Sequence, residues 1–200
     1  MPKTAGSSFL VILKHIYGSR LQTIYKTEEG VARIWEEGLP EIPPGKDAIH
    51  GHFPATRSLV ERYPKARLVA WVREPVARMI SYYHFWKREK PHGNPRHDDF
   101  LARKYSLLEF ARLDYMKAEM FEYFRRISVE RFGFIGMVEY FDKDIRLLAD
   151  QMGWTLPEIP LANVTPQKKR IDEAEKRELE EILSGEIAFY RKVKKMRGRM

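Results

Sequence analysis

Lys3 and the small residues after it form the first segment of the sequence with the composition of a binding site. The small residues are Thr4, Ala5, Gly6, Ser7 and Ser8, and a helical pattern with Phe9, Leu13, Ile16 and Tyr17 on one face follows. Small side chains let main-chain N–H groups approach an anion, and the start of a helix adds its positive end. Lys3 adds a mobile positive charge. The segment therefore predicts a phosphate-binding loop, and the alternative is a flexible N-terminus with a serine-capped helix.

Arg73 and Ser81 form a second candidate for anion binding. Arg73 ends a continuous apolar run, and Pro75 suits the first position of a helix. Ser81 comes eight residues after Arg73. Ligands of doubly wound sheets bind at the carboxyl ends of the strands, and an arginine fork with a hydroxyl suits a phosphate. The alternative is a surface pair between Arg73 and Glu74, with Ser81 as an ordinary helix serine.

His50 and His52 are the candidates for proton transfer. Residues two apart on an extended chain share a face, although Gly51 between them can interrupt that geometry. Histidine suits general-base chemistry near neutral pH. A hydrogen-bonded structural histidine is the alternative for each. We expect no metal site, because no third ligand follows at a suitable spacing.

Strands and helices alternate along the sequence, which favours a parallel α/β sheet flanked by helices over a helix bundle. Strands are expected at 47–50, 67–72 and 132–137, and helices at 58–63, from Pro75, over 107–126 (one helix or a pair) and over 141–152. Loops are expected at 37–46, 91–99 and 155–169. Asp172 and Glu175 have capping-box spacing for a long final helix. We expect a single domain over residues 1–200.

The composition excludes several classes of protein. Hydrophobic residues make up 44% and aromatic residues 12% of the chain, which excludes a disordered protein. Because cysteine is absent, disulfides, Cys-ligated metal centres and thiol nucleophiles are excluded, and a reducing compartment is favoured. No apolar run approaches the roughly 18 residues of a transmembrane helix, and the N-terminus is too short and polar for a secretory signal. We therefore expect a cytoplasmic protein.

The positive charge of the chain is concentrated at its C-terminus. The formal net charge is +8, and the last ten residues hold six basic residues and no acidic one. Removing those six charges leaves +2. We therefore expect a basic tail over 190–200, no nucleic-acid partner, and an anionic ligand bound at a local site.

The three motifs, in this order, resemble those of sulfotransferases that use 3′-phosphoadenosine 5′-phosphosulfate (PAPS). The likeness is closest to the carbohydrate branch with the heparan sulfate and uronyl 2-O-sulfotransferases and their bacterial relatives. PKTAGSSF is similar to the 5′-phosphosulfate loop of that family, and VREPVARMISYYHFWK is similar to its 3′-phosphate motif. The HGH segment and FGFIGMVEYFDKDIRLLADQMG resemble its catalytic-histidine segment and a later strand and helix.

The resemblance implies a role for each candidate residue. Lys3 would meet the charge that develops on the departing phosphate, and His52 would be the general base, with His50 orienting or substituting for it. The 5′-phosphosulfate would be held by Thr4, Ala5, Gly6, Ser7 and Ser8, and the 3′-phosphate by Arg73 and Ser81. Lys168, Lys169 and Arg170 would close over the nucleotide, and a solvated charge run is their alternative. No metal is required.

Two departures from the family bear on the fold and the location. The family delivers its phosphate loop from a first strand, whereas this chain begins at the loop, so we expect the first strand to be missing. The Golgi members carry a membrane anchor and disulfides, and their absence here favours a bacterial-type relative.

Two other functions stay open at this point. A P-loop-like nucleotide kinase would place its lysine after the glycine, whereas Lys3 precedes Gly6. A nucleotide-binding relative with impaired catalysis is the other. The acceptor would be a hydroxyl-bearing molecule and is expected to be a glycan. We expect loops 38–46 and 91–103 to border its site. The second loop contains Arg96, His97 and Arg103, which would suit an anionic glycan; a solvated loop is the alternative.

Overall fold

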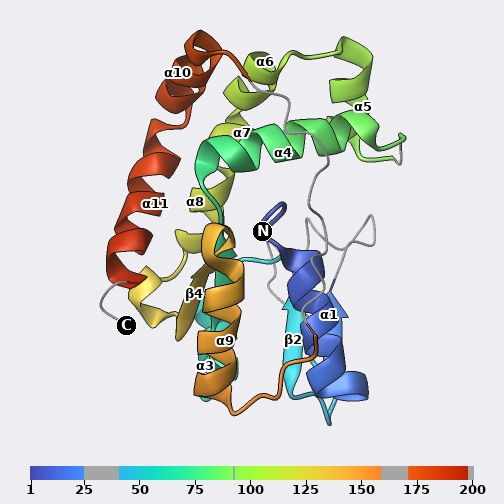
Figure 1. Cartoon of the computed structure of the whole chain (residues 1–200). Coiled ribbons are helices and arrows are strands. Elements are labelled where there is room, and N and C mark those ends of the chain that lie inside the picture. The colour runs from blue at the N-terminus through green and yellow to red at the C-terminus, as the bar shows by residue number, and fades with distance from the viewer. Residues whose placement is uncertain (25–40, 92, 159–170, 198–200) are drawn as a thin grey trace. The chain divides into compact units, whose positions relative to one another are not determined.

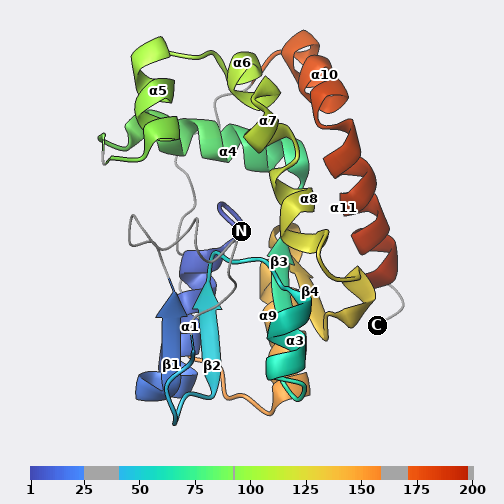
Figure 2. The ribbon, with the colours of Figure 1, turned by 180° about the vertical axis from the view of Figure 1, so that it is seen from behind.

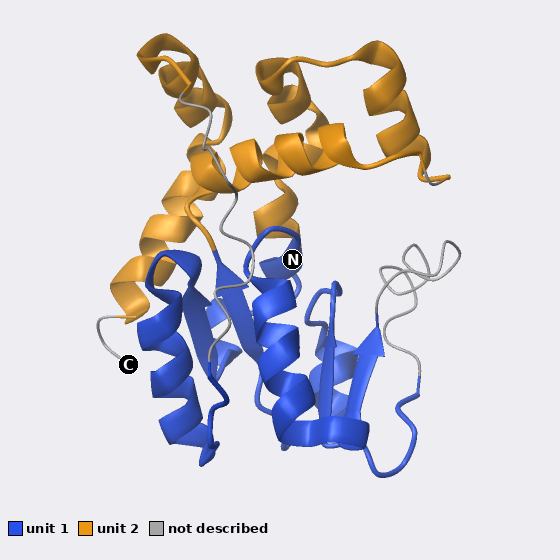
Figure 3. Cartoon of the chain, turned by 45° about the vertical axis from the view of Figure 1, so that its right-hand side comes forward, with its two compact units in different colours: residues 1–72, 123–166 blue, residues 73–122, 167–200 orange. Residues whose placement is uncertain are grey.

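The computed structural model describes residues 1–24, 41–91, 93–158 and 171–197 (Figure 1). The chain forms two compact units, which are described separately (Figure 3). Unit 1 comprises Met1–Val72 and Tyr123–Pro166, and unit 2 comprises Arg73–Glu122 and Gln167–Met200.

Unit 1 contains two short parallel sheets (Figure 2). Strand β1 (Leu21–Ile24) pairs with β2 (Ala48–Gly51), and β3 (Val69–Val72) pairs with β4 (Phe134–Met137). The registers place Leu21 opposite Ala48 and Val69 opposite Phe134. The predicted α/β class and parallel pairing are confirmed, but the single expected sheet is divided into two pairs within the described residues.

Helices cover these strands on both faces. They are α1 (Gly6–Tyr17), α3 (Arg57–Arg62) and α9 (Phe141–Met152), with short 3-10 turns η1 (Gly18–Arg20), η2 (Val129–Arg131) and η3 (Val138–Tyr140). Within unit 1, α1 and α9 lie on one side of the strands and α3 lies on the other (Figures 1 and 2). Strand β4 is buried along its whole length, so it needs cover on both faces.

The core of unit 1 joins α1 and α9 to the strands. Phe9, Ile12 and Leu13 of α1 pack with Trp71, Phe134, Ile145 and Leu148, among others. The indole of Trp71 fills the space above Gly136, where an added Cβ would lie 2.4 Å from the ring. Buried Asp144 accepts a hydrogen bond from the Met137 N–H (2.8 Å), which ties α9 to the end of β4.

Unit 2 is helical. Its helices are α4 (Pro75–Arg88), α5 (Pro95–Arg103), α6 (Leu107–Arg112), α7 (Asp114–Lys117), α10 (Glu173–Ile182) and α11 (Ser184–Arg197), and α8 (Glu119–Phe124) crosses the boundary of the units. Met79, Trp86 and Phe110 lie in its core. No helix in the described ranges has the length and apolarity to cross a bilayer.

Local capping corrects three of the predicted boundaries. The loop expected at 91–99 is wrong from Pro95 onward, because the Asn94 side chain accepts from the Arg96 and His97 N–H groups and starts α5. The helix expected over 107–126 is three short helices. The helix from Asp172 ends at Ile182, and α11 begins at Ser184.

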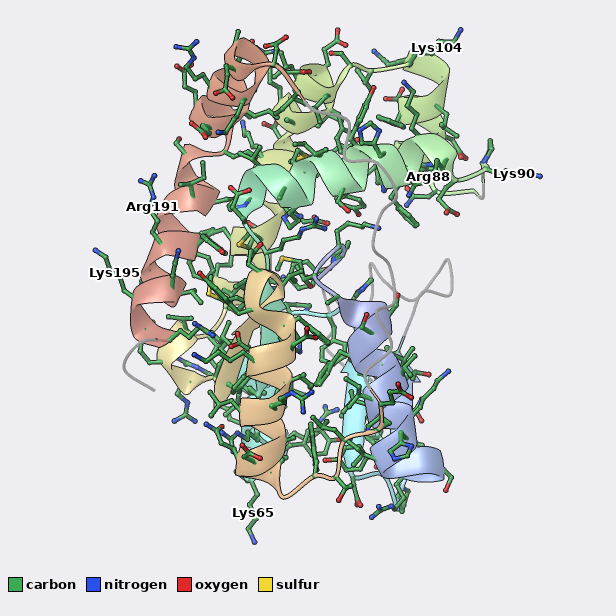
Figure 4. All side chains as sticks on the ribbon, in the orientation of Figure 1. Lys65, Arg88, Lys90, Lys104, Arg191 and Lys195 are labelled. Atoms are coloured by element: carbon green, nitrogen blue, oxygen red, sulfur yellow. The ribbon has the colours of Figure 1, made fainter. Side chains whose placement is uncertain are left out.

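Most of the expected basic tail belongs to α11. Val193 is fully buried, whereas the neighbouring Arg191 and Lys195 are exposed and extend away from the ribbon (Figure 4). The helix thus presents basic residues to solvent while Tyr190 and Val193 are buried.

A buried ionic cluster joins three helices of unit 2. The Arg78 guanidinium on α4 is fully buried; it donates to Glu119 on α8 (2.6 Å) and to both carboxylate oxygens of Glu186 on α11 (3.2 and 2.9 Å). Glu186 also accepts from the Met120 N–H (2.6 Å). Burial opposes the charge of Arg78, yet the two carboxylates raise its pKa above the usual value. The cluster therefore depends on all three charges being present.

We predict that Arg78→Met destabilises the protein by about 3–5 kcal/mol, because it leaves the Glu186 carboxylate buried without its cation. Urea unfolding at neutral pH measures the loss. The control is Arg103→Met, which removes an exposed pair with Asp99 and is expected to change little. Equal losses of unfolding free energy for the two substitutions would contradict a stabilising role of the buried cluster.

Candidate functional site

The loop before α1 has an unusual main-chain conformation. Lys3 and Ala5 adopt left-handed φ angles of 64° and 59°, on either side of Thr4. Non-glycine residues rarely do so, and alternation of this kind turns successive N–H groups toward a common concave side. Ala5 is the N-cap of α1, and its carbonyl accepts the first helical bond from the Phe9 N–H (3.0 Å). The loop therefore directs main-chain donors away from the helix core.

The helix that begins at Gly6 has no side-chain cap, and its first turn contains no acidic residue. The positive end of a helix dipole attracts anions, and a capping carboxylate would compete with one. This is the arrangement expected of an anion site. It differs from α4, where Glu74 accepts from the Val76 and Ala77 N–H groups (3.1 and 2.7 Å).

The hydroxyl side chains of the loop are placed differently from one another. The Thr4 side chain is buried, and its Oγ1 donates to the Met1 carbonyl (2.9 Å), so this hydroxyl closes the loop. Ser8 is buried within the first turn of α1, whereas Ser7 is exposed. The structure therefore favours main-chain contacts for Thr4.

His52 lies beside the loop that precedes α1. A Cβ placed on Gly6 would be 3.8 Å from His52 Nε2, so the imidazole is within van der Waals distance of the start of α1. His52 follows directly after β2 and Gly51, which places it at the carboxyl end of that strand. The structure thus brings His52 close to Gly6, at the start of α1.

His50 has a different environment. Its ring packs edge-on against Phe9 of α1, with centroids 5.7 Å apart. Burial, and secondarily the positive amino terminus, lowers the pKa of His50 to about 4. His50 is therefore neutral near pH 7. A general base becomes positively charged when it accepts a proton, and burial opposes that charge, so the environment of His50 suits a structural or orienting residue better.

Both histidines line a cavity of about 350 Å³ that lies within unit 1. Met1, Thr4 and Gly6 of the loop reach one part of it, and Phe9, Leu13 and Trp71 are among its apolar walls. The site therefore has a polar part at the loop and an apolar interior.

Arg73 and Ser81 lie in unit 2, so the two segments predicted to bind anions belong to different compact units. Arg73 directly follows β3, and Ser81 is half-buried on α4. Lys168, Lys169 and Arg170 lie outside the described residues.

The residues expected to meet an anionic acceptor have partners inside unit 2. His97 is buried and its Nε2 lies 2.9 Å from the Trp86 carbonyl oxygen. Arg96 stacks over the Tyr115 ring at 4.5 Å, and Arg103 pairs with Asp99 (2.7 Å). These contacts favour structural roles. Of the other loop, only 41–46 is described, and there the Lys46 ammonium donates to the Ser19 carbonyl (2.6 Å).

Trp71 is the site residue that the sequence did not reveal. It is only 6% exposed, it lines the cavity, and its indole Nε1 has no hydrogen-bond partner in the described part of the chain. Buried indole N–H groups usually have an acceptor. In the sequence Trp71 is one more apolar residue of a strand, and no local signal distinguishes it.

Neither protein-family models nor curated proteins show a match to this chain.

We predict that His50 makes folding stability depend on pH. Its folded pKa of about 4 lies below the unfolded value of 6.5, so the stability is complete above pH 6.5 and falls as the pH drops toward 4. His50→Asn should remove about 2–3 kcal/mol of the difference in unfolding free energy between about pH 7.5 and 4.5. Urea denaturation at both values measures it. The control is His15→Asn, on the exposed part of α1. The prediction would be contradicted if the unfolding free energies of His50→Asn and the parent protein changed equally between the two pH values.

Proposed function

We propose that this protein is a PAPS-dependent sulfotransferase that transfers a sulfuryl group to a hydroxyl of a glycan or small-molecule acceptor. The observation that carries the proposal is the geometry of the loop: left-handed Lys3 and Ala5 lead into an uncapped helix N-terminus, with His52 beside Gly6. An anion cradle and a base within one small site suit transfer from an anionic donor to a neutral hydroxyl.

The proposed reaction is an in-line transfer. The acceptor oxygen attacks sulfur, and the bond from sulfur to the 5′-phosphate oxygen breaks. The electron pair of that bond stays on the phosphate oxygen of 3′-phosphoadenosine 5′-phosphate (PAP), and the hydroxyl proton passes to His52. Lys3 would stabilise the charge that develops on the bridging oxygen. The N–H groups of Thr4–Ser8 would hold the 5′-phosphosulfate in line for attack.

The 3′-phosphate would be held by Arg73 and Ser81. The order of the motifs along the chain and the position of Arg73 directly after β3 support this assignment. Lys168, Lys169 and Arg170 would close over the nucleotide. The fold we propose is accordingly of the sulfotransferase type.

Arg73→Ala should weaken binding of PAP by about 1.5–3 kcal/mol, the range for a hydrogen bond to a charged group. Isothermal titration calorimetry with PAP and with AMP measures this, since AMP lacks the 3′-phosphate. The control is Arg88→Ala at the exposed end of α4, the helix that carries Ser81 (Figure 4). We expect the parent protein to prefer PAP and Arg73→Ala to lose that preference. Equal affinity of the parent for PAP and AMP would rule the assignment out, and tighter binding of ATP with magnesium would favour a kinase.

His52→Ala should reduce sulfuryl transfer by about 10²–10⁴-fold while PAP affinity is nearly unchanged, since a general base acts on the acceptor. Release of PAP from PAPS in the presence of an acceptor mixture measures turnover. His15→Ala on the exposed part of α1 is the matched control. Normal turnover of His52→Ala would remove it from the mechanism. A parent that binds PAP without turnover would indicate the catalytically impaired relative.

A further inference from the structure

The buried indole N–H of Trp71 is directed away from β4. Trp71 and Gly136 are register partners, and the Cε3, Cζ3 and Cη2 atoms of the indole lie over Gly136, where an added Cβ would be. Nε1 lies on the opposite edge of the indole, toward the side of β3 on which β2 lies (Figure 2). Residues of β2 and β3 line the cavity, whereas none of the four residues of β4, all of them described, does so. The Nε1–H therefore faces the cavity.

The walls of the cavity are largely aromatic and apolar. Phe9 of α1 packs on both Trp71 and His50, with ring centroids 5.6 and 5.7 Å apart. Phe124 and Phe132 also line the cavity, and their ring centroids are 5.1 Å apart. Walls of this kind favour a ligand with an apolar surface, and a few polar groups then fix its orientation.

The charged side chains among the described lining residues are paired within unit 1. The Lys46 ammonium donates to a carbonyl of η1 (2.6 Å), and Asp47 accepts from Arg20 (2.5 Å). Arg67 donates to the Gly133 carbonyl (2.9 Å). These partners leave the charges committed to the chain. The many hydroxyls of a glycan would lose their water against the apolar walls without gaining partners.

The volume of the cavity, about 350 Å³, is at the lower end of the range for small-molecule sites, roughly 300–1,000 Å³. The Trp71 Nε1–H has no acceptor in the part of the chain that the structure describes, although the side chain is more than nine-tenths buried. A buried donor is costly to leave unpaired, so a ligand that supplies an acceptor gains affinity over one that does not. The cavity therefore suits a compact, mainly apolar ligand with an oxygen atom directed at this N–H.

We infer that this cavity is the acceptor site of the proposed transferase, and that the acceptor is a compact, mainly apolar alcohol or phenol whose second oxygen accepts from the Trp71 Nε1–H. The inference rests on the proposed function, because it places the reacting hydroxyl at His52, which lines the cavity beside Gly6. The hydroxyl oxygen bonds to sulfur, its proton passes to His52, and the 5′-phosphate leaves with the electron pair of the broken sulfur–oxygen bond. Trp71 then selects for the second oxygen.

The binding test uses 4-hydroxyacetophenone, which has a carbonyl opposite its hydroxyl, and 4-isopropylphenol, which has a similar size and no carbonyl. NMR titrations without PAPS compare the parent with Trp71→Phe, which keeps an aromatic ring and loses the N–H. We expect the ketone to bind the parent saturably, to move the indole N–H resonance downfield, and to bind Trp71→Phe about tenfold more weakly. The affinity of 4-isopropylphenol should differ between the two proteins by less than about twofold, which controls for altered packing over Gly136.

The transfer test uses PAPS and measures release of PAP from the parent protein. We expect release with 4-hydroxyacetophenone to be at least about tenfold faster than with maltose, a disaccharide, at equal concentration.

The inference would be overturned if neither phenol bound saturably, if the indole N–H resonance stayed unchanged at saturation, or if Trp71→Phe weakened both phenols equally. Faster transfer to maltose would also overturn it. Each of these outcomes is compatible with preferential binding of PAP over AMP, and thus leaves the proposed function standing. Loss of that preference in the parent overturns the proposed function, whereas binding of the phenols is measured without PAP, so the two failures are distinguishable.

Discussion

The main chain between Met1 and Gly6 turns into α1 without a side-chain cap on the N–H groups of that helix. The rest of the site depends on this turn. Two non-glycine residues in the left-handed region, Lys3 and Ala5, make it. Each costs about 1–3 kcal/mol and persists only when surrounding contacts enforce it. The Thr4–Met1 hydrogen bond and the burial of Thr4 and Ser8 provide those contacts.

The position of α1 passes this constraint on to the rest of unit 1. Phe9, one turn into the helix, packs on Trp71 and on His50, with ring centroids 5.6 and 5.7 Å apart. Helix α1 therefore contributes to the burial that lowers the pKa of His50, and it forms one wall of the cavity lined by β2 and β3. Met1 and Thr4 line the same cavity, so the loop and the cavity share residues. A ligand in one would contact groups that shape the other.

Three of the four described strands and most helices could be predicted because their signals are local, whereas β1 (Leu21–Ile24) was not predicted. The apolar runs ending at Val72 and Met137 and the proline at position 75 mark β3, β4 and the start of α4. Asn94 and Pro95 are a typical start of a helix and do begin α5. The segment was nevertheless predicted to be a loop, because the surrounding proline, glycine and charged residues are typical of loops. The division of the sheet could not be predicted, because strand pairing is set by contacts distant in sequence.

The candidate site was predictable to a similar degree. The motif at Lys3–Ser8 and the histidine after a strand indicated which residues to examine, but the approach of His52 to Gly6 joins residues 46 positions apart and has no local signature. His97 illustrates the reverse case. Its place in a polar segment suggested a ligand contact, whereas its ring is buried against Trp86 and Phe100, where α5 packs on α4.

An amide NMR titration of the protein with PAP tests most directly whether main-chain N–H groups of the loop bind the 5′-phosphate. We expect the amide resonances of Gly6, Ser7 and Ser8 to undergo the largest shifts, move downfield and saturate together. Shifts confined to the exposed basic residues of α11, with the Gly6–Ser8 resonances unchanged, would contradict it.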